Sequence, residues 1–207
     1  MNGDKVFLER TLDRALHIYT TGLREWGKDG SGYNRYEATP YGALEQFFSN
    51  YKLTEEDQFV DVGCGRGRVA FYVHDKFQIP VKGIEANDRT FDEALKNLET
   101  YLKRKHHIAN PIHFDYGLAE QFPLDKKDNR FYFFNPFSAK IFKRVIMNIR
   151  KSIMEHPREV EIILYYPLES YQDILQTAGF FIVNQMKVRN DHGKYGKFIV
   201  YRFMDPQ

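Results

Sequence analysis

Apolar residues recur along this chain with two different periods, and the alternation between them predicts the order of its elements. Apolar positions three and four residues apart predict amphipathic helices, and short apolar runs between polar turns predict buried strands. A helix is expected at 5–20, with one face made of Leu8, Leu12, Ala15, Leu16 and Tyr19. A second helix is expected after Thr39-Pro40, a pair typical of an N-cap followed by a proline in the first turn.

From residue 58 onward, expected strands and helices alternate. The strands are expected at 58–63, 80–85, 112–115, 130–134 and 160–166, and the helices at 66–77, 87–105, from Ser138 to Ile153, and at 169–178. Two last strands, 180–188 and 198–203, are joined by the short link 190–193, which favours an antiparallel hairpin. This order predicts an α/β fold with a doubly wound, mostly parallel sheet of seven strands. We expect a single domain over 1–207, with an N-terminal helical or lid extension at 1–56 and the sheet core at 57–207.

Composition narrows the class of protein. The chain has 207 residues, of which 43% are hydrophobic and 16% aromatic, enough for one sizeable core. A net charge of +2 gives no strong indication of nucleic acid binding. The single cysteine, Cys64, excludes an internal disulfide and fits a reducing compartment, and no metal-ligand spacing occurs. Without a signal-peptide pattern or a long apolar run, we expect a soluble, cytoplasmic protein with no membrane and no metal.

The stretch from Phe59 to Gly67 carries the clearest chemical signal. An apolar run ends in glycines at every second position, Gly63, Gly65 and Gly67, and a helical pattern follows at once. Glycines allow a tight turn whose backbone a ligand can approach, and the next helix directs its free N–H groups at that ligand. The nicotinamide fingerprint G-x-G-x-x-G is spaced differently, since the third glycine comes one residue early here.

The segment Val60-Asp61-Val62-Gly63-Cys64-Gly65-Arg66-Gly67 resembles the first motif of class I S-adenosylmethionine-dependent methyltransferases. The resemblance covers roughly residues 58–204, and seven strands closed by an antiparallel hairpin are that family's architecture. It implies that the turn, Cys64 included, holds the methionine end of the cofactor and that Asp61 lies near its amino group.

Acidic residues follow the next two expected strands. Glu85 lies 22 residues beyond Gly63, where a carboxylate accepts hydrogen bonds from both hydroxyls of a ribose. Nicotinamide enzymes place an acid at a similar distance. Glu85 therefore predicts a nucleoside but does not distinguish a nicotinamide cofactor from S-adenosylmethionine. For Asp115, after the third strand, the resemblance implies a contact with the adenine amino group, although the usual Gly-Asp order is absent.

The stretch Asn135-Pro136-Phe137 follows the fourth strand and resembles the Asn/Asp-Pro-Pro-Tyr/Phe motif of methyltransferases that act on amino nitrogens of bases or of glutamine. The resemblance implies that the Asn135 side chain and the Pro136 carbonyl orient the acceptor and that Phe137 stacks on it. One proline is missing here. A structural alternative is that Asn135 caps a helix that begins at Pro136.

The segment 21–38 is rich in glycine and aromatic residues and is too long for an ordinary connection, which indicates a lid or binding loop. We expect Trp26, Tyr33 and Tyr36 to contribute to it. Tyr36 and Thr39 are candidates for contact with the cofactor, because segments ahead of the first strand fold over it in the resembled family.

The sequence therefore predicts methyl transfer from S-adenosylmethionine, with a nitrogen acceptor favoured. The acceptor itself, whether a small molecule, a protein side chain or an RNA base, stays open. Two alternatives remain: a NAD(P)-dependent oxidoreductase, and a cofactor-binding regulatory module without turnover.

Overall fold

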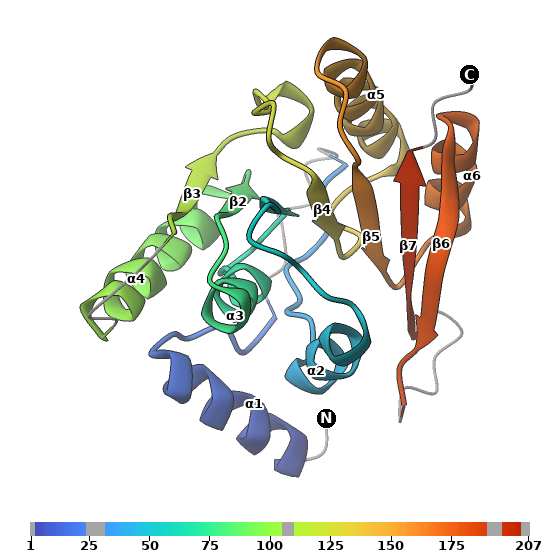
Figure 1. Ribbon diagram of the computed structural model, residues 1–207. Coiled ribbons are helices and arrows are strands. Elements are labelled where there is room, and N and C mark those ends of the chain that lie inside the picture. Colours follow the sequence, from blue (N-terminus) through green and yellow to red (C-terminus); the bar gives the residue numbers. More distant parts are fainter. Residues whose placement is uncertain (1–2, 24–31, 105–109, 190–195, 204–207) are drawn as a thin grey trace.

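The computed structural model describes residues 3–23, 32–104, 110–189 and 196–203. Its centre is one sheet of seven strands in the order β3-β2-β1-β4-β5-β7-β6, with helices on both faces (Figure 1). The strands are β1 (Phe59–Val62), β2 (Val81–Glu85), β3 (Ile112–Tyr116), β4 (Arg130–Phe133), β5 (Glu161–Tyr165), β6 (Phe180–Lys187) and β7 (Lys197–Phe203). The predicted doubly wound α/β fold with a closing hairpin is confirmed.

The chain reverses its direction of winding at β1. From β1 the order runs outward through β2 to β3, returns to β4 on the other side of β1, and continues to β5. These five strands are parallel, whereas β7 pairs antiparallel with both β5 and β6. The carboxyl ends of β1 and β4 are therefore neighbours, and such a switch point is where open α/β sheets bind ligands.

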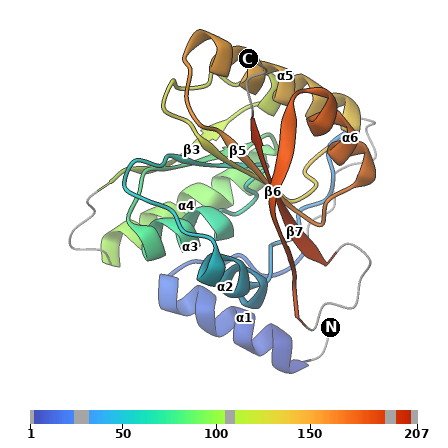
Figure 2. The same ribbon diagram turned by 45° about the vertical axis from the view of Figure 1, so that its right-hand side comes forward.

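Alternate side chains of the strands enter two separate cores, as the period of two requires. Phe59 of β1 packs on the face covered by helices α2 (Tyr41–Asn50), α3 (Arg68–Phe77) and α4 (Asp88–Arg104). Val60 and Val62 face the opposite side, under α5 (Ala139–Glu155) and α6 (Glu169–Thr177). Figure 2 shows α5 and α6 together on one side of the sheet, away from α2 and α3. Asp61, between two residues of the second core, thus points toward the α3 face.

The first helix, α1 (Gly3–Leu16), differs from the prediction in length and in the face it buries. It ends four residues early, and Leu8 is half exposed while Glu9 and Asp13 are buried. Leu12 and Leu16 of the predicted face pack against the core, but Leu8, Ala15 and Tyr19 are exposed, because the buried acids Glu9 and Asp13 take the inward positions beside α3.

The expected N-cap of α2 also differs. Pro40 itself is the N-cap residue and makes no side-chain cap, and Thr39 lies one position earlier with its hydroxyl turned to Tyr132.

The lid residue Trp26 and the 190–193 link lie outside the described residues. None of the helices in the described ranges combines the length and apolar character that a membrane span requires.

Candidate functional site

The turn after β1 requires glycine at each of its three positions. Gly63, Gly65 and Gly67 have φ of 75°, 57° and 87°, in the left-handed region that other residues rarely adopt. The backbone N–H groups of Gly63 and Cys64 both donate to the Ile84 carbonyl, at 2.9 and 3.0 Å. The turn is thereby tied to the end of β2, and α3 begins directly after it at Arg68.

Glu85, the last residue of β2, lies against this turn. One carboxylate oxygen accepts from the Gly65 N–H at 2.8 Å and the other from the Asn87 N–H at 2.8 Å. Glu85 is buried, and burial raises the pKa of its carboxyl despite these backbone donors. The Ala86 backbone also donates toward this carboxylate, and its remaining lone-pair capacity can accept a further hydrogen bond.

Asp61 is buried on β1, one residue before the end of the strand. Burial raises the pKa of its carboxyl to about 8, although a hydrogen bond from the Ala70 backbone opposes the shift. Its Oδ2 atom has no hydrogen-bond partner among the described residues. A buried, unpartnered carboxylate oxygen is costly in a folded protein, which makes it a candidate for binding a donor from outside the chain.

Cys64 is buried in the turn, and its thiol makes a weak contact with the Gly65 carbonyl at 3.6 Å. Burial raises the pKa of this thiol well above its ordinary value. A reactive cysteine needs the opposite shift, so this environment does not suit a nucleophile. The side chain is small enough to lie close to Gly83, where any Cβ would come within 2.9 Å of the sulfur.

The strap, defined here as residues 32–39, crosses the switch point between β1 and β4. Tyr36 is buried; its hydroxyl donates to the Thr20 carbonyl at 2.7 Å, and its ring lies where a Cβ on Gly65 would be. The Thr39 hydroxyl lies 2.7 Å from that of Tyr132 on β4. Tyr36 therefore lies at the glycine turn, and Thr39 lies against β4.

Asn135, Pro136 and Phe137 follow β4 and pack against the strap. Asn135 has φ of 43°, and its side-chain amide donates to the Tyr166 carbonyl at 2.8 Å. The Pro136 side chain lies where a Cβ on Gly63 would be. Phe137 is fully buried, with its ring edge-on to Phe133, so in this conformation it belongs to the core. The acceptor-binding roles implied by the motif remain predictions.

A single cleft brings most of the predicted site residues together. Its lining includes Tyr36, Thr39, Asp61, Gly63, Cys64, Glu85, Pro136 and Phe137. Gly65 lies beneath Tyr36, and Gly67 packs against Phe71 and Phe114. The cleft measures about 50 Å³, which is room for a few water molecules.

Asp115 and Asn135, like the covered Gly65 and Gly67, are predicted residues that do not line this cleft. Asp115 lies on β3, partly exposed, with one carboxylate oxygen 3.3 Å from His113 Nε2. The next glycine, Gly117, does line the cleft, and its N–H donates to the Glu85 carbonyl at 3.0 Å. An adenine contact by Asp115 remains a prediction.

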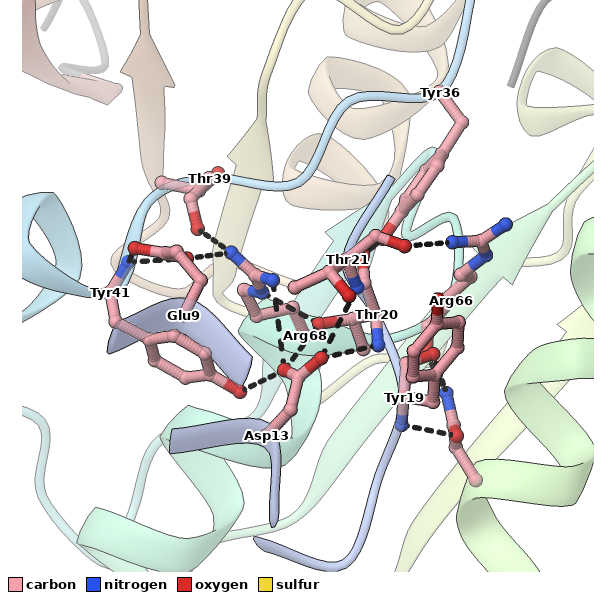
Figure 3. Close-up of polar contacts among 11 residues, drawn as sticks. Glu9, Asp13, Tyr19, Thr20, Thr21, Tyr36, Thr39, Tyr41, Arg66 and Arg68 are labelled. Atoms are coloured by element: carbon pink, nitrogen blue, oxygen red, sulfur yellow. Dashed lines mark hydrogen bonds and ion pairs between the residues drawn. The ribbon is translucent and has the colours of Figure 1, made fainter. Parts of the chain in front are cut away.

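Sequence reasoning missed a buried polar network beside the cleft (Figure 3). Arg68, the first residue of α3, donates to Glu9, to the Thr39 carbonyl at 3.2 Å and to Thr20 Oγ1 at 2.7 Å. Asp13 accepts from the Thr20 backbone at 2.6 Å. A cation directly after Gly67, together with acids four residues apart on α1, was the signal that could have indicated it.

Arg66 secures the same region from the other side of the turn. It donates to the Thr21 carbonyl at 2.6 Å and to Glu93 at 2.7 Å, and its guanidinium lies 5.0 Å from the Tyr36 ring centre. Figure 3 shows Tyr36 and Arg66 converging on the segment 19–21. The N-terminal segment, the strap and the glycine turn are thus held as one unit.

Within the described residues, no cluster of three or more acidic, histidine or cysteine side chains is arranged to hold a metal ion.

Comparison with known proteins identifies the fold. Neither a protein-family profile nor a curated protein sequence matches this chain. A SAM-dependent methyltransferase from Methanosarcina mazei superposes with a TM-score of 0.57 at 15% identity, covering 76% of this chain and 97% of that one. One from Aquifex aeolicus gives 0.58 at 14% identity, covering 77% and 89%.

A third solved structure shows that this fold does not by itself specify the reaction. The [4+2]-cyclase SpnF superposes with a TM-score of 0.62 at 16% identity, covering 97% of this chain and 94% of that one. The chain therefore has the class I SAM-dependent methyltransferase fold. Identities this low establish the fold and not the reaction, as a cyclase among the matches illustrates.

Proposed function

We propose that this protein is an S-adenosylmethionine-dependent methyltransferase with a nitrogen acceptor. One observation carries the cofactor assignment: the orphan Oδ2 of buried Asp61 and the carboxylate of Glu85 line one cleft with the glycine turn, at the switch point of the sheet. The methyltransferase fold supports the same assignment.

The residues of the cleft fit this cofactor chemically. Asp61 would bind the α-ammonium group, which supplies the donors that Oδ2 lacks, and Glu85 would accept the ribose hydroxyls. The three glycines add no side chains to the turn, and the methionine end would reach its backbone once the Tyr36 ring leaves Gly65. The room is insufficient while the strap lies as described, because ligand sites of this kind measure about 300–1,000 Å³. Cofactor binding therefore requires the strap to move.

The cofactor supplies an activated methyl group on a sulfonium. In the transfer, a nitrogen lone pair of the acceptor forms the C–N bond, the S–C bond breaks with its electron pair passing to sulfur, and a proton leaves the nitrogen to water. The chain's task is to align the acceptor and exclude bulk water, which can supply roughly 7–11 kcal/mol of barrier reduction. The nitrogen preference rests on the Asn135-Pro136-Phe137 sequence beside the cleft.

Isothermal titration calorimetry tests the cofactor assignment. We expect S-adenosylmethionine and S-adenosylhomocysteine to bind with micromolar affinity and NAD⁺ and NADP⁺ not to bind. An Asp61→Ala variant should bind S-adenosylmethionine at least tenfold more weakly, whereas Asp125→Ala, on a surface turn, should bind it normally. Binding of NAD(P) without S-adenosylmethionine would support the oxidoreductase alternative. Absence of S-adenosylmethionine binding at 1 mM, the upper end of the range of typical enzyme KM values, would end the proposal.

The nitrogen preference has its own test. Incubation with methyl-labelled S-adenosylmethionine and panels of amines, amide-bearing peptides and short RNAs should place label on nitrogen, located by mass spectrometry. Transfer to oxygen, sulfur or carbon would refute the preference. Cofactor binding with no transfer to any panel would favour a regulatory module.

A further inference from the structure

The strap does more than cover the cleft, because it pairs with the segment that follows β4. Ser138 N–H donates to the Gly32 carbonyl at 2.6 Å, and Asn34 N–H donates to the Pro136 carbonyl at 2.9 Å. Between these bonds Tyr33 and Phe137 form an isolated antiparallel bridge. The strap thus lies on residues 136–138 as a short added strand.

Asn34 satisfies two consecutive carbonyls of the acceptor motif. Its backbone N–H donates to the Pro136 carbonyl, and its side-chain carboxamide donates to the Asn135 carbonyl at 2.8 Å. A planar NH₂ group of the chain itself is therefore hydrogen-bonded at the loop that the proposed function assigns to an acceptor nitrogen. Asn34 also lines the cofactor cleft, together with Pro136.

Tyr33 fixes the register of this pairing. Its ring packs edge-on to Phe137, with ring centres 5.6 Å apart, and its hydroxyl donates to Glu120 at 2.8 Å. An aromatic side chain thus occupies the position before the carboxamide. Backbone bonds give affinity and alternate side chains give specificity when an extended peptide adds to an exposed strand.

Movement of the strap would free both the cofactor cleft and the backbone carbonyls that follow β4. While Tyr36 covers Gly65, the cleft of about 50 Å³ excludes a nucleoside. Lifting the strap would remove Tyr36 from the turn and release the Asn135 and Pro136 carbonyls together, because Asn34 and Tyr36 are only two residues apart.

We infer that the strap is a built-in substrate mimic, and that the true acceptor is an extended polypeptide that docks on residues 135–138 and presents a carboxamide where Asn34 now lies. The assignment of the docked group as methyl acceptor rests on the proposed function. The docking itself does not, since it depends only on the pairing described above.

Peptide binding to strap-weakened variants tests this inference. Asn34→Ala removes the carboxamide bond, and Asn34→Pro removes the backbone bond as well while keeping the residue extended. The probe is a fluorescein-labelled peptide with the sequence of residues 32–39, Gly-Tyr-Asn-Arg-Tyr-Glu-Ala-Thr. Asn50→Ala is the matched control, because it deletes a surface amide-to-carbonyl bond on α2.

Fluorescence anisotropy should show tighter peptide binding as the strap is weakened. At a net 0.5–1.5 kcal/mol per hydrogen bond, we expect an increase of about threefold for Asn34→Ala and about tenfold or more for Asn34→Pro over the wild type. Asn50→Ala should match the wild type. A peptide with Ala in place of Asn should bind Asn34→Pro several-fold more weakly. Circular dichroism melts establish that each variant is folded.

Several outcomes would overturn the inference. These are equal peptide binding by the wild type and Asn34→Pro, indifference to the Asn-to-Ala change in the peptide, or displacement of the peptide by a short adenine-rich RNA. Calorimetry with S-adenosylmethionine on the same variants separates the two proposals. Graded peptide binding without cofactor binding would leave the docking surface and remove methyl transfer. Cofactor binding without peptide binding would remove the docking surface and leave the methyltransferase proposal standing.

Discussion

At the scale of single residues, Asp61 is a buried carboxyl that destabilises the fold near neutral pH, which supports its proposed role as a binding group. A buried carboxyl with a pKa of about 8 binds its proton more tightly in the folded chain than in the unfolded one, where the pKa is near 3.8. Well below pH 3.8 both states are protonated. As pH rises toward 8 the unfolded state ionises first, so Asp61 makes the fold progressively less stable in this window.

Replacing Asp61 should therefore stabilise the protein while harming its function. We expect Asp61→Asn to raise the free energy of unfolding at pH 8, by an amount on the order of a few kcal/mol, and to leave it nearly unchanged at pH 4. Urea denaturation at both pH values measures the difference. Asp57→Asn is the control and should destabilise, because Asp57 is buried and paired with Arg130 at 3.0 Å. A destabilised Asp61→Asn variant at pH 8 would contradict the argument.

The same carboxyl predicts a pH dependence of cofactor binding. Below pH 8 Asp61 must lose its proton to bind an ammonium group, so the affinity for S-adenosylmethionine should fall by up to about tenfold for each pH unit below 8. Calorimetry at pH 6.5 in buffers of different ionisation enthalpy should report release of about one proton. Proton release that persists in Asp61→Asn would assign the linkage to another group.

At the scale of elements, the N-terminal helix is held by buried charges as well as by the apolar contacts of Leu12 and Leu16. Arg68 on α3 is the shared partner of Glu9 and Asp13 on α1, with its Nη2 atom 3.6 Å from Asp13. All three residues are buried. Removing one member of a buried charge cluster leaves the others unpaired, which costs more than the cluster contributes in net stability.

Arg68→Met should therefore destabilise the fold strongly. We expect a loss of about 3–5 kcal/mol in the free energy of unfolding, measured by urea denaturation at pH 7. The conservative control is Arg10→Met, on the exposed side of α1, which should change stability by less than about 0.5 kcal/mol. An Arg68→Met variant as stable as the wild type would mean that α1 is held mainly by packing.

At the scale of the whole molecule, the site joins segments far apart in the chain and is closed by one of them. The glycine turn, the β2 end and the segment after β4 meet at the switch point, and the strap lies across all three. Under the proposed function the strap has to lift before the cofactor enters, so association should be limited by strap opening and not by diffusion.

Weakening the strap at Tyr36 should accelerate cofactor entry. Tyr36→Phe keeps the ring and removes the hydrogen bond to the Thr20 carbonyl, so we expect the association rate constant of S-adenosylmethionine to rise about fivefold. Surface plasmon resonance with the immobilised protein gives this rate. Tyr72→Phe, which loses a peripheral contact with Lys76, is the control. An unchanged rate in Tyr36→Phe would show that the strap does not gate entry.

The sequence by itself determined the sheet and which residues gather at its switch point. Apolar runs and glycines are local signals: a strand buried on both faces must be continuously apolar, and a left-handed turn requires glycine. The order of elements therefore followed from periodicity, and Asp61, Gly63 and Glu85 could be placed at one sheet edge because parallel strands end together.

Only the tertiary structure decided which side chains are paired and which are left open. That Glu9 and Asp13 face inward depends on Arg68, more than fifty residues away, and no local pattern reports such a partner. In the same way Asn34 meets Asn135 across a sequence separation of 101 residues. Pairings of this kind depend on how the chain closes on itself in space, and they fix the strap over a site whose residues the sequence had already positioned.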